Sequence, residues 1–310
     1  MPERPPQTVI LIAGPTASGK SGLALAIARA HGGMIINADS MQVYRELRII
    51  TARPTPEEER EIPHALYGFV PAAEAYSVGR YVEDAGRAVA EARARGLRPI
   101  IVGGTGLYFK ALLEGLSPIP PVDAGIRERW RLAAEREGAR ALHARLAGID
   151  PATARRLMPT DKQRIVRALE VAESTGRPLS AWQRQPGRPL LAEGETTRLL
   201  VVAEREALMQ RIDRRFDAML AAGVLEEIRA FASLGLSEEL PSVRAHGVRP
   251  LLAHLAGRLS LEAAAEGSKA ETRQYAKRQV TWHRRNMSSW KAIDTQQMES
   301  LSSKNAMFID

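Results

Sequence analysis

Gly14-Pro15-Thr16-Ala17-Ser18-Gly19-Lys20-Ser21 fits the pattern G-x-x-x-x-G-K-[ST] at every fixed position. An apolar run at residues 9–13 precedes this stretch, and helix-forming residues at 22–28 follow it. The pattern requires a strand, a glycine-rich turn and a helix, in that order. Such a turn points backbone N–H groups at a phosphate, and the helix N-terminus adds a positive dipole. The stretch therefore predicts a P-loop, in which Lys20 supplies charge and the Ser21 hydroxyl binds Mg²⁺.

Further apolar runs extend this unit into a sheet. Residues 34–38, 99–102 and 199–203 are expected to form strands beside residues 9–13. The first three runs along the chain alternate with helical patterns, which predicts an α/β fold with a parallel P-loop NTPase-like sheet flanked by helices. The expected helices include residues 21–30, 79–95, 127–137 and 207–222. The last twenty residues are polar, and we expect them to be loosely ordered.

Proline-rich breaks at residues 117–121 and 185–189 interrupt the α/β pattern. Neither segment can continue a helix or a central strand. Between them lies an Arg-rich stretch with helical patterns and no convincing strand. We therefore expect an α/β catalytic core over residues 1–117 and 196–310, interrupted by a mostly helical insertion over residues 118–195.

The bulk composition is that of a soluble globular protein, with 45% hydrophobic and 26% charged residues. The chain has no cysteine, which excludes disulfides, thiolate metal sites and cysteine nucleophiles. Residues 1–8 do not resemble a signal peptide and no apolar run approaches 18 residues, so we expect a cytoplasmic protein without a membrane span. The net charge of +8 suits a polyanionic partner, although 37 of the 44 basic residues are Arg, a bias that a GC-rich genome could produce alone.

Candidate site residues follow the second and third expected strands. The carboxyl ends of parallel strands line the ligand crevice, so Asp39 is expected near the P-loop, as a general base or as a Mg²⁺ ligand through water. A helix cap or turn is the alternative role for Asp39. The third strand is followed by Gly103-Gly104-Thr105-Gly106, where an ATPase often has an acidic residue. Because Thr105 offers a hydroxyl without charge, this turn favours gripping phosphates over activating water.

Two basic segments could face a nucleic acid. In the first, residues 161–171, Gln163, Arg164 and Arg167 can face outward while the apolar residues face a core. In the second, residues 269–285, Arg273, Lys277 and Arg284 share one side of a helix, within about 40° of each other. A solvated basic face is the alternative for both segments.

The sequence resembles the tRNA dimethylallyltransferase, or tRNA isopentenyltransferase, family over nearly all of residues 8–290. The P-loop is shared by many unrelated proteins. Two motifs are far more specific for this family, and they are Asp39-Ser40-Met41-Gln42-Val43-Tyr44 and Gly103-Gly104-Thr105-Gly106-Leu107-Tyr108. The resemblance also rests on Thr51-Ala52-Arg53-Pro54, Ile62-Pro63-His64, residues 163–170 and residues 272–279.

The family transfers a dimethylallyl group from dimethylallyl diphosphate to N6 of the adenine just 3′ of the anticodon. The resemblance implies that the P-loop binds this diphosphate through Gly14, Pro15, Thr16, Ala17, Ser18, Gly19, Lys20 and Ser21. Thr105 and Arg215 would help to position it, and Lys20 with Mg²⁺ on Ser21 would offset the charge of the leaving group. Asp39 would accept the proton of the amine, once the base is flipped into a channel.

The resemblance further implies that the helical insertion grips the anticodon stem-loop of tRNA, and we expect the protein to be a monomer. The residues expected to contact tRNA are Asp39, Ser40, Met41, Gln42, Gln163, Arg164, Ile165, Val166, Arg167, Arg244, Arg249, Arg273 and Lys277. The chain departs from the family at Val248, where an aromatic residue is usual, and at Thr160-Asp161-Lys162-Gln163-Arg164, which stands for Asn-Asp-Pro-Gln-Arg.

Three other functions are open to the same residues. A small-molecule kinase would use ATP at the P-loop, but the third strand lacks the usual acidic residue. An isopentenyltransferase acting on free adenylate would not need a helical insertion to hold RNA. A non-catalytic RNA-binding protein would have no need for the intact Lys20, Ser21 and Asp39.

Overall fold

The computed structural model describes residues 8–294, and the chain divides into two compact units. The first unit contains Met1–Leu113 and Leu190–Asp310, and the second contains Glu114–Pro189. The second unit ends before residue 195, the last residue of the expected insertion, because the N–H groups of Leu190 and Leu191 both donate to the Leu112 carbonyl. That pairing joins the chain after Pro189 to the first unit.

The first unit is built on a six-stranded parallel sheet with the order β3-β2-β4-β1-β5-β6. The strands are β1 (Val9–Ala13), β2 (Gly33–Asn37), β3 (His64–Ala65), β4 (Arg98–Gly103), β5 (Thr196–Val202) and β6 (Lys291–Asp294). The predicted α/β class with a parallel sheet is confirmed. The two short edge strands, β3 and β6, were not expected. Residues 291–294 of the supposedly loose tail form β6, and the rest of that tail lies outside the described residues.

β1 is apolar throughout, and β2 and β4 are apolar over most of their length, because helices cover both faces of the sheet. Ile10 and Ile12 pack against helix α1 (Lys20–His31) on one face. Leu11 packs on the opposite face, against α3 (Val78–Ala94) and α4 (Gly106–Glu114). The acidic run after Pro56 forms helix α2 (Pro56–Glu61), in which Glu57 and Glu61 are exposed while Glu58 and Glu59 are partly buried.

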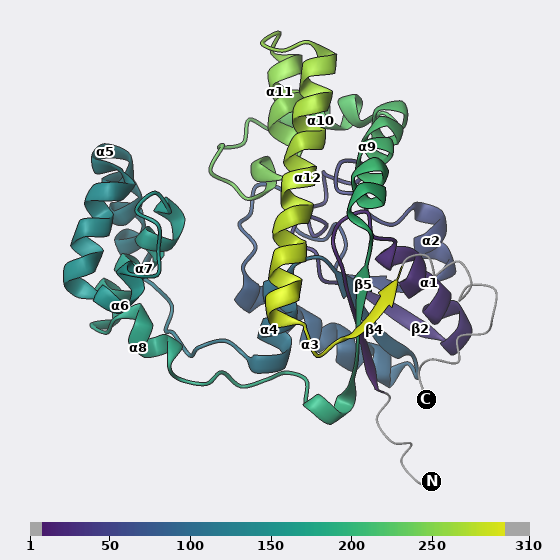
Figure 1. Ribbon diagram of the computed structural model, residues 1–310, viewed down its shortest axis with the longest axis horizontal. Coiled ribbons are helices and arrows are strands. Elements are labelled where there is room, and N and C mark those ends of the chain that lie inside the picture. The colour runs from purple at the N-terminus through teal and green to yellow at the C-terminus, as the bar shows by residue number, and fades with distance from the viewer. Residues whose placement is uncertain (1–7, 295–310) are drawn as a thin grey trace. The chain divides into compact units, whose positions relative to one another are not determined.

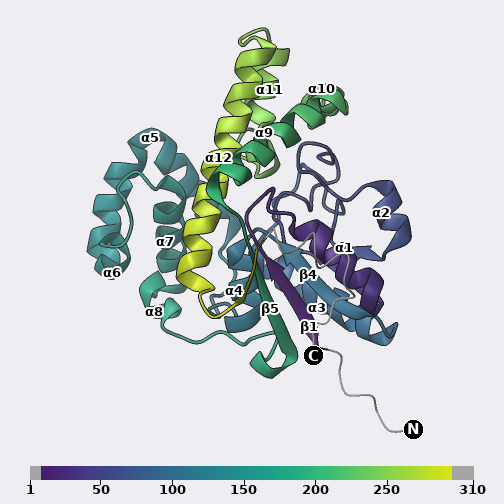
Figure 2. The ribbon, with the colours of Figure 1, turned by 45° about the vertical axis from the view of Figure 1, so that its right-hand side comes forward.

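The remaining helices of this unit form a group that extends beyond the ends of the strands (Figures 1 and 2). They are α9 (Arg205–Ala221), α10 (Val224–Ala232), α11 (Val248–Leu255) and α12 (Leu261–Asn286). Two single 3₁₀ turns, η1 (Glu193–Glu195) and η2 (Ser242–Arg244), precede β5 and α11. The buried residues of this group share a core with the segment that follows β2, including Val43 and Leu47. This packing holds α12 and α9 beside the loops that carry the candidate site.

The second unit is entirely helical and has its own core. Its helices are α5 (Ala124–Ile149), α6 (Pro151–Ala154), α7 (Lys162–Thr175) and α8 (Leu179–Gln183). The α5 segment is two helices joined at Gly138, whose φ of 80° and ψ of 162° are not helical. The expected helix at 127–137 is the first of the two. Leu142, Leu146 and Ile165 are among the fully buried residues of the core.

None of the helices described between residues 8 and 294 is long and apolar enough to cross a bilayer.

Candidate active site

The P-loop has the conformation that its glycines predict. β1 ends at Ala13, and α1 begins at Lys20 after Gly19, whose φ of 88° is accessible to glycine at little cost. The Ser18 N–H closes the turn by donating to the Pro15 carbonyl over 3.2 Å. The free N–H groups at the start of α1 therefore stand at the carboxyl edge of the sheet, where they can receive an anion.

Two cations from different helices meet this loop. The Lys20 ammonium, at the start of α1, lies 3.4 Å from the Pro15 carbonyl, and Arg215 Nη2 of α9 donates to Thr16 Oγ1 over 2.6 Å. Burial lowers the pKa of Lys20 to about 8; the Asp39 carboxylate opposes this shift, and the Arg215 charge adds to it. Burial also lowers the pKa of Arg215. Two desolvated cations side by side make an anionic ligand favourable here.

Asp39 and Thr105 follow the adjacent strands β2 and β4. The Ser40 N–H donates to Thr105 Oγ1 over 3.0 Å, and the Thr105 N–H donates to the Ala38 carbonyl over 3.2 Å. Asp39 Oδ1 accepts from the Met41 N–H over 2.9 Å, while Oδ2 accepts no hydrogen bond from residues 8–294. The carboxylate is thus held through one oxygen and keeps the other available.

Gln279 of α12 is a site residue that the sequence analysis missed. Its side chain is buried, with Oε1 accepting from the Thr16 N–H and Nε2 donating to the Gly104 carbonyl, both over 2.9 Å. A Cβ at Gly104 would lie 2.1 Å from Nε2, so this glycine is required for the contact. Gln279 lies in one of the sequence motifs that carry the family resemblance, but no local pattern indicates which residues its side chain bridges.

Tyr275 and His246 complete this side of the site. Their rings are tilted by 42° with centroids 4.5 Å apart, and Tyr275 interacts with Thr105 and Gln279. Burial raises the pKa of Tyr275 above its ordinary value and lowers the pKa of His246. Both rings are therefore uncharged at neutral pH, next to the residues that follow β4.

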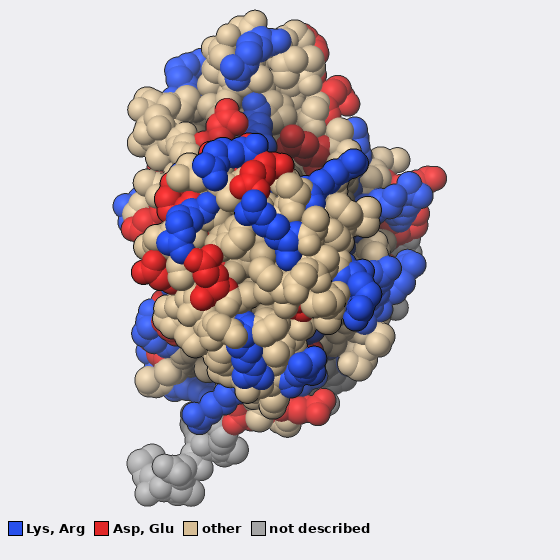
Figure 3. All heavy atoms as spheres, turned by 90° about the vertical axis from the view of Figure 1, so that its left-hand side faces the viewer, with Lys and Arg blue, Asp and Glu red and all other residues tan. Residues whose placement is uncertain are grey.

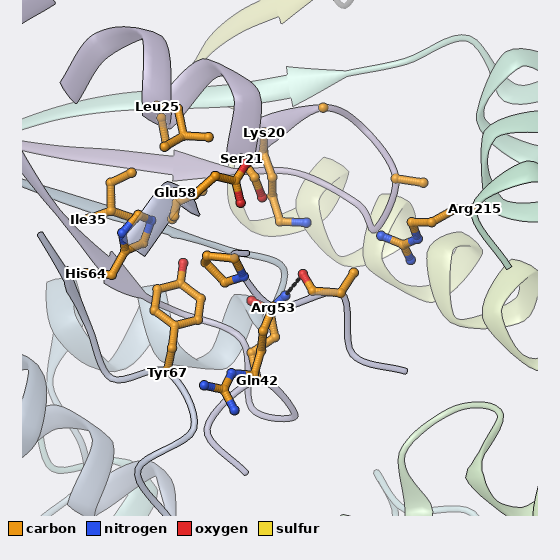
Figure 4. A pocket seen from close by; sticks show the side chains of 16 residues that line it. Lys20, Ser21, Leu25, Ile35, Gln42, Arg53, Glu58, His64, Tyr67 and Arg215 are labelled. Atoms are coloured by element: carbon orange, nitrogen blue, oxygen red, sulfur yellow. Dashed lines mark hydrogen bonds between the residues drawn. The ribbon is translucent and has the colours of Figure 1, made fainter. Parts of the chain in front are cut away.

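A cavity of about 290 Å³ opens beside the P-loop. Figure 4 shows Lys20 reaching toward it from α1 while Arg215 approaches from α9. Its other walls include Leu25, Ile35 and Tyr67. The cavity thus offers a cationic end and an apolar wall to one ligand.

The expected tRNA-contacting residues of the first unit occupy different positions. The Gln42 amide is held by the carbonyls of Thr51 and Ala52, at 2.9 and 2.8 Å. Arg273 is paired with Asp213 over 2.6 Å, which partly neutralises it. Three further basic side chains are exposed, and they are Arg244 in η2, Arg249 in α11 and Lys277 in α12.

The expected contacts of the second unit lie on α7. Gln163, Arg164 and Arg167 are exposed, whereas Ile165 is fully buried and Val166 is partly buried in the core of this unit. The Ile165 side chain therefore packs inward, whereas the three polar side chains face solvent.

A metal would find few protein ligands in the described part of the chain. Residues 8–294 contain no group of three or more His, Cys, Asp or Glu side chains placed to hold a metal ion. The Ser21 hydroxyl is exposed at the start of α1, directly after the P-loop lysine. This fits a Mg²⁺ ion that takes most of its ligands from phosphates and water.

Comparisons with known proteins give a consistent family. A model of the IPP transferase family matches residues 42–286, and a model described as isopentenyl transferase matches residues 7–64. The tRNA dimethylallyltransferase of Rhodopseudomonas palustris strain TIE-1 is 54% identical over 291 residues, which are 94% of this chain and 97% of the relative. That of Parvibaculum lavamentivorans is 53% identical over 301 residues, covering 97% of this chain and 95% of the relative.

Solved structures agree with these relatives. The tRNA isopentenylpyrophosphate transferase of Bacillus halodurans superposes with a TM-score of 0.67 and 31% identity, covering 96% of this chain and 95% of that one. A eukaryotic dimethylallyltransferase, captured acting on tRNA, superposes with a TM-score of 0.82 and 29% identity over 96% of this chain and 76% of that one. With more than half the chain matched by the family model and relatives above 50% identity along nearly their full length, the chain belongs to the tRNA dimethylallyltransferase family.

Proposed function

We propose that this protein transfers a dimethylallyl group from dimethylallyl diphosphate to N6 of the adenine just 3′ of the anticodon in tRNA. The observation that carries the proposal is the meeting of Lys20 and Arg215 at the P-loop, with the partly free Asp39 carboxylate close enough to oppose the lowering of the Lys20 pKa. Cations suit a diphosphate leaving group, and a carboxylate with one available oxygen suits the proton of an amine.

The diphosphate would bind in the P-loop, against the first N–H groups of α1 and between Lys20 and Arg215. As the C1–O bond of the donor breaks, negative charge grows on the departing oxygen, and these fixed cations stabilise it without reorganising. Ser21 would hold Mg²⁺, which would supply further charge neutralisation on the leaving group when bound. The apolar wall at Leu25 and Ile35 gives the five-carbon chain a place out of water.

The acceptor amine would approach Asp39. As N6 attacks C1 of the donor, the amine loses one proton, which Asp39 Oδ2 would take while Oδ1 keeps its bond to the Met41 N–H. Thr105 holds the segment after β2 through the Ser40 N–H, so the base and the phosphate cradle stay in fixed relation. Tyr275 and His246 offer flat, uncharged rings beside this segment.

The tRNA would be held by basic residues of both units, Arg244, Arg249, Lys277, Arg164 and Arg167 among them. The all-helical second unit favours an RNA acceptor over free adenylate, which would not need it. A cytoplasmic location and a monomeric state stay predictions.

Incubation with dimethylallyl diphosphate, Mg²⁺ and bulk tRNA, followed by mass analysis of the nucleosides, tests this proposal. We expect dimethylallyladenosine from tRNA and none from free adenylate. Modification of adenylate alone would favour the free-nucleotide enzyme. ATP turnover with an alcohol acceptor and no prenyl transfer would favour a kinase, and tRNA binding without any transfer would favour a binding protein.

A further inference from the structure

Positive charge is concentrated in the second unit. Residues 114–189 contain fourteen Lys and Arg against nine Asp and Glu, so they carry +5 of the net +8 of the chain. Figure 3 shows basic and acidic side chains interspersed on one face of the molecule, as expected where many of them pair. Within the second unit, the arginines with a carboxylate oxygen within 4 Å are Arg129, Arg131, Arg136, Arg145, Arg164 and Arg167.

Arg155, Arg156 and Arg184 do not belong to that paired set. None of the three has an Asp or Glu oxygen within 4 Å among residues 8–294, and all three are exposed. Together with Ser180 and Gln183 they line a single open pocket of about 300 Å³ between α6 and α8. Three guanidinium groups around one pocket repel each other unless an anion neutralises them.

The walls of this pocket are fixed by a buried carboxylate. Asp150, which is 1% exposed, caps α6 by accepting from the Thr153 N–H over 3.0 Å. Its second oxygen accepts from Thr153 Oγ1 over 2.7 Å and from the Ser180 N–H of α8 over 2.9 Å. The bond to Ser180 ties the start of α6 to α8, so the fold of the unit holds together the two segments that line the pocket.

One of the three arginines is also held in place. Arg156 Nη2 donates to Gln183 Oε1 over 2.9 Å and lies 3.3 Å from Thr153 Oγ1, which bridges the two helices. Part of the entropy of ordering this long side chain is therefore lost before any ligand binds. A guanidinium group fixed in this way retains N–H donors that match the paired oxygens of a phosphate.

We propose that Arg155, Arg156 and Arg184 form a binding site for the phosphodiester groups of the tRNA backbone. The inference rests on the proposed function, because tRNA is the polyanion that it supplies. An RNA backbone fits better than a single free phosphate, since the pocket is open and its cations come from the two separate segments that follow α6 and α8. The pocket also lies on the same unit as the exposed Arg164 and Arg167, and the chain runs directly from α6 to α7. Contacts to phosphates carry no sequence information. The site would therefore position the tRNA, in addition to the contacts expected on α7.

Binding of tRNA to the full-length protein at several salt concentrations tests the site. The variant is R155A/R184A, which leaves Arg156 and its bridge to Gln183 in place. Its Kd for tRNA should rise, and the slope of log K against log salt should fall by about one to two units, since each phosphate contact contributes a little under one. R155K/R184K should keep most of the slope, because it keeps the charge.

The matched control is R136A/R145A, which removes the same charge from exposed arginines of the same unit that pair with Glu137. The proposal is overturned if both double variants change the salt slope equally, or if R155A/R184A binds like the unmodified protein. Equal melting temperatures show that the variants are folded. Binding is measured without the prenyl donor, so a protein that binds tRNA through this site but transfers no prenyl group would contradict the proposed function alone. If R155A/R184A weakens the binding of an acidic protein but leaves the Kd for tRNA unchanged, the proposal is overturned as well.

Discussion

Gln279 Oε1 accepts a hydrogen bond of 2.9 Å from the Thr16 N–H, although 263 positions separate the two residues. The same amide donates to the Gly104 carbonyl, so one buried side chain fixes the P-loop to the turn after β4. The spacing between Lys20 and Thr105 therefore depends on α12, which comes from the far end of the chain.

Gln279→Ala should raise KM for dimethylallyl diphosphate and lower the melting temperature, because a buried N–H and a buried carbonyl lose their partner at about 1–3 kcal/mol each. Gly104→Ala should have a similar effect, since its Cβ would lie 2.1 Å from Gln279 Nε2. The loss of stability in the double variant should be much smaller than the sum of the losses in the two single variants. Gly22→Ala, where a Cβ meets nothing within 4 Å, is the control. Strict additivity would show that the two residues are not coupled.

Lys20→Ala should lower kcat/KM for the donor. The loss should correspond to about 2–4 kcal/mol of transition-state stabilisation, as for other preorganised charge contacts. Affinity for tRNA should change little, because the P-loop holds the donor. Steady-state kinetics beside a tRNA-binding measurement would check this. Near-normal kcat/KM for dimethylallyl diphosphate would contradict the role of the lysine.

The pH dependence of donor use should report Lys20. Its pKa of about 8 in the free protein means that it loses its charge as pH rises through 8, so kcat/KM for the donor should fall above that pH. His283 is not a competing source of this step, because burial, and then the Lys20 charge, lower its pKa to about 4. In Lys20→Ala the step should vanish from the profile of the remaining activity. A step of unchanged size in that variant would assign it to another group.

The free energy of unfolding should rise over the pH range in which Lys20 loses its proton, whereas kcat/KM for the donor should fall. Between pH 8 and 10.5 the unfolded chain keeps a proton on Lys20 that the folded chain has lost, so this group makes unfolding harder as pH rises through that window. Comparing denaturant unfolding of the protein and of Lys20→Ala at pH 7.5 and 9.5 isolates the contribution. The gap in stability should move in favour of the lysine protein at the higher pH, and a gap that moves the other way would rule out the lowered pKa.

Asp39→Asn keeps the oxygen that accepts from the Met41 N–H but removes the base, so the rate should fall by about 10²–10⁴ with little change in melting temperature. Single-turnover transfer at saturating donor and tRNA measures this step. A protein that melts earlier and yet has normal specific activity would show that Asp39 acts only as a turn residue.

Arg164→Ala with Arg167→Ala should raise KM for tRNA and spare KM for the donor, since both side chains are exposed on α7. If both contact phosphates, the salt slope should fall by roughly two units. If one contacts a base edge, affinity should fall with little change in slope, and discrimination among loop sequences should relax. The control R60A/R87A removes two exposed arginines from the first unit. Unchanged tRNA affinity and unchanged salt dependence together would place the α7 arginines outside the interface.

The parts of the fold that the sequence predicts are those whose signal is local. β1 and β4 are buried on both faces, so they read as unbroken apolar runs, and the P-loop follows one of them directly. The edge strands lack such a signal. β3 has two residues, and β6 buries only Ile293 of its four, so neither differs from a polar loop.

The site was predictable only in part, for a related reason. Lys20, Asp39 and Thr105 were expected because each follows a strand of a parallel sheet. Gln279 was missed because its partners, Thr16 and Gly104, are determined by how α12 packs and by no pattern near residue 279. The contact between His246 and Tyr275 likewise joins two segments that meet only in the folded chain.

Transfer from labelled dimethylallyl diphosphate to two anticodon stem-loop RNAs, identical except for adenine or guanine just 3′ of the anticodon, tests the account most directly. We expect label on the adenine RNA, none on the guanine RNA, and a loss of label with Lys20→Ala or Asp39→Asn. Equal labelling of both RNAs, or transfer that survives both substitutions, would contradict it.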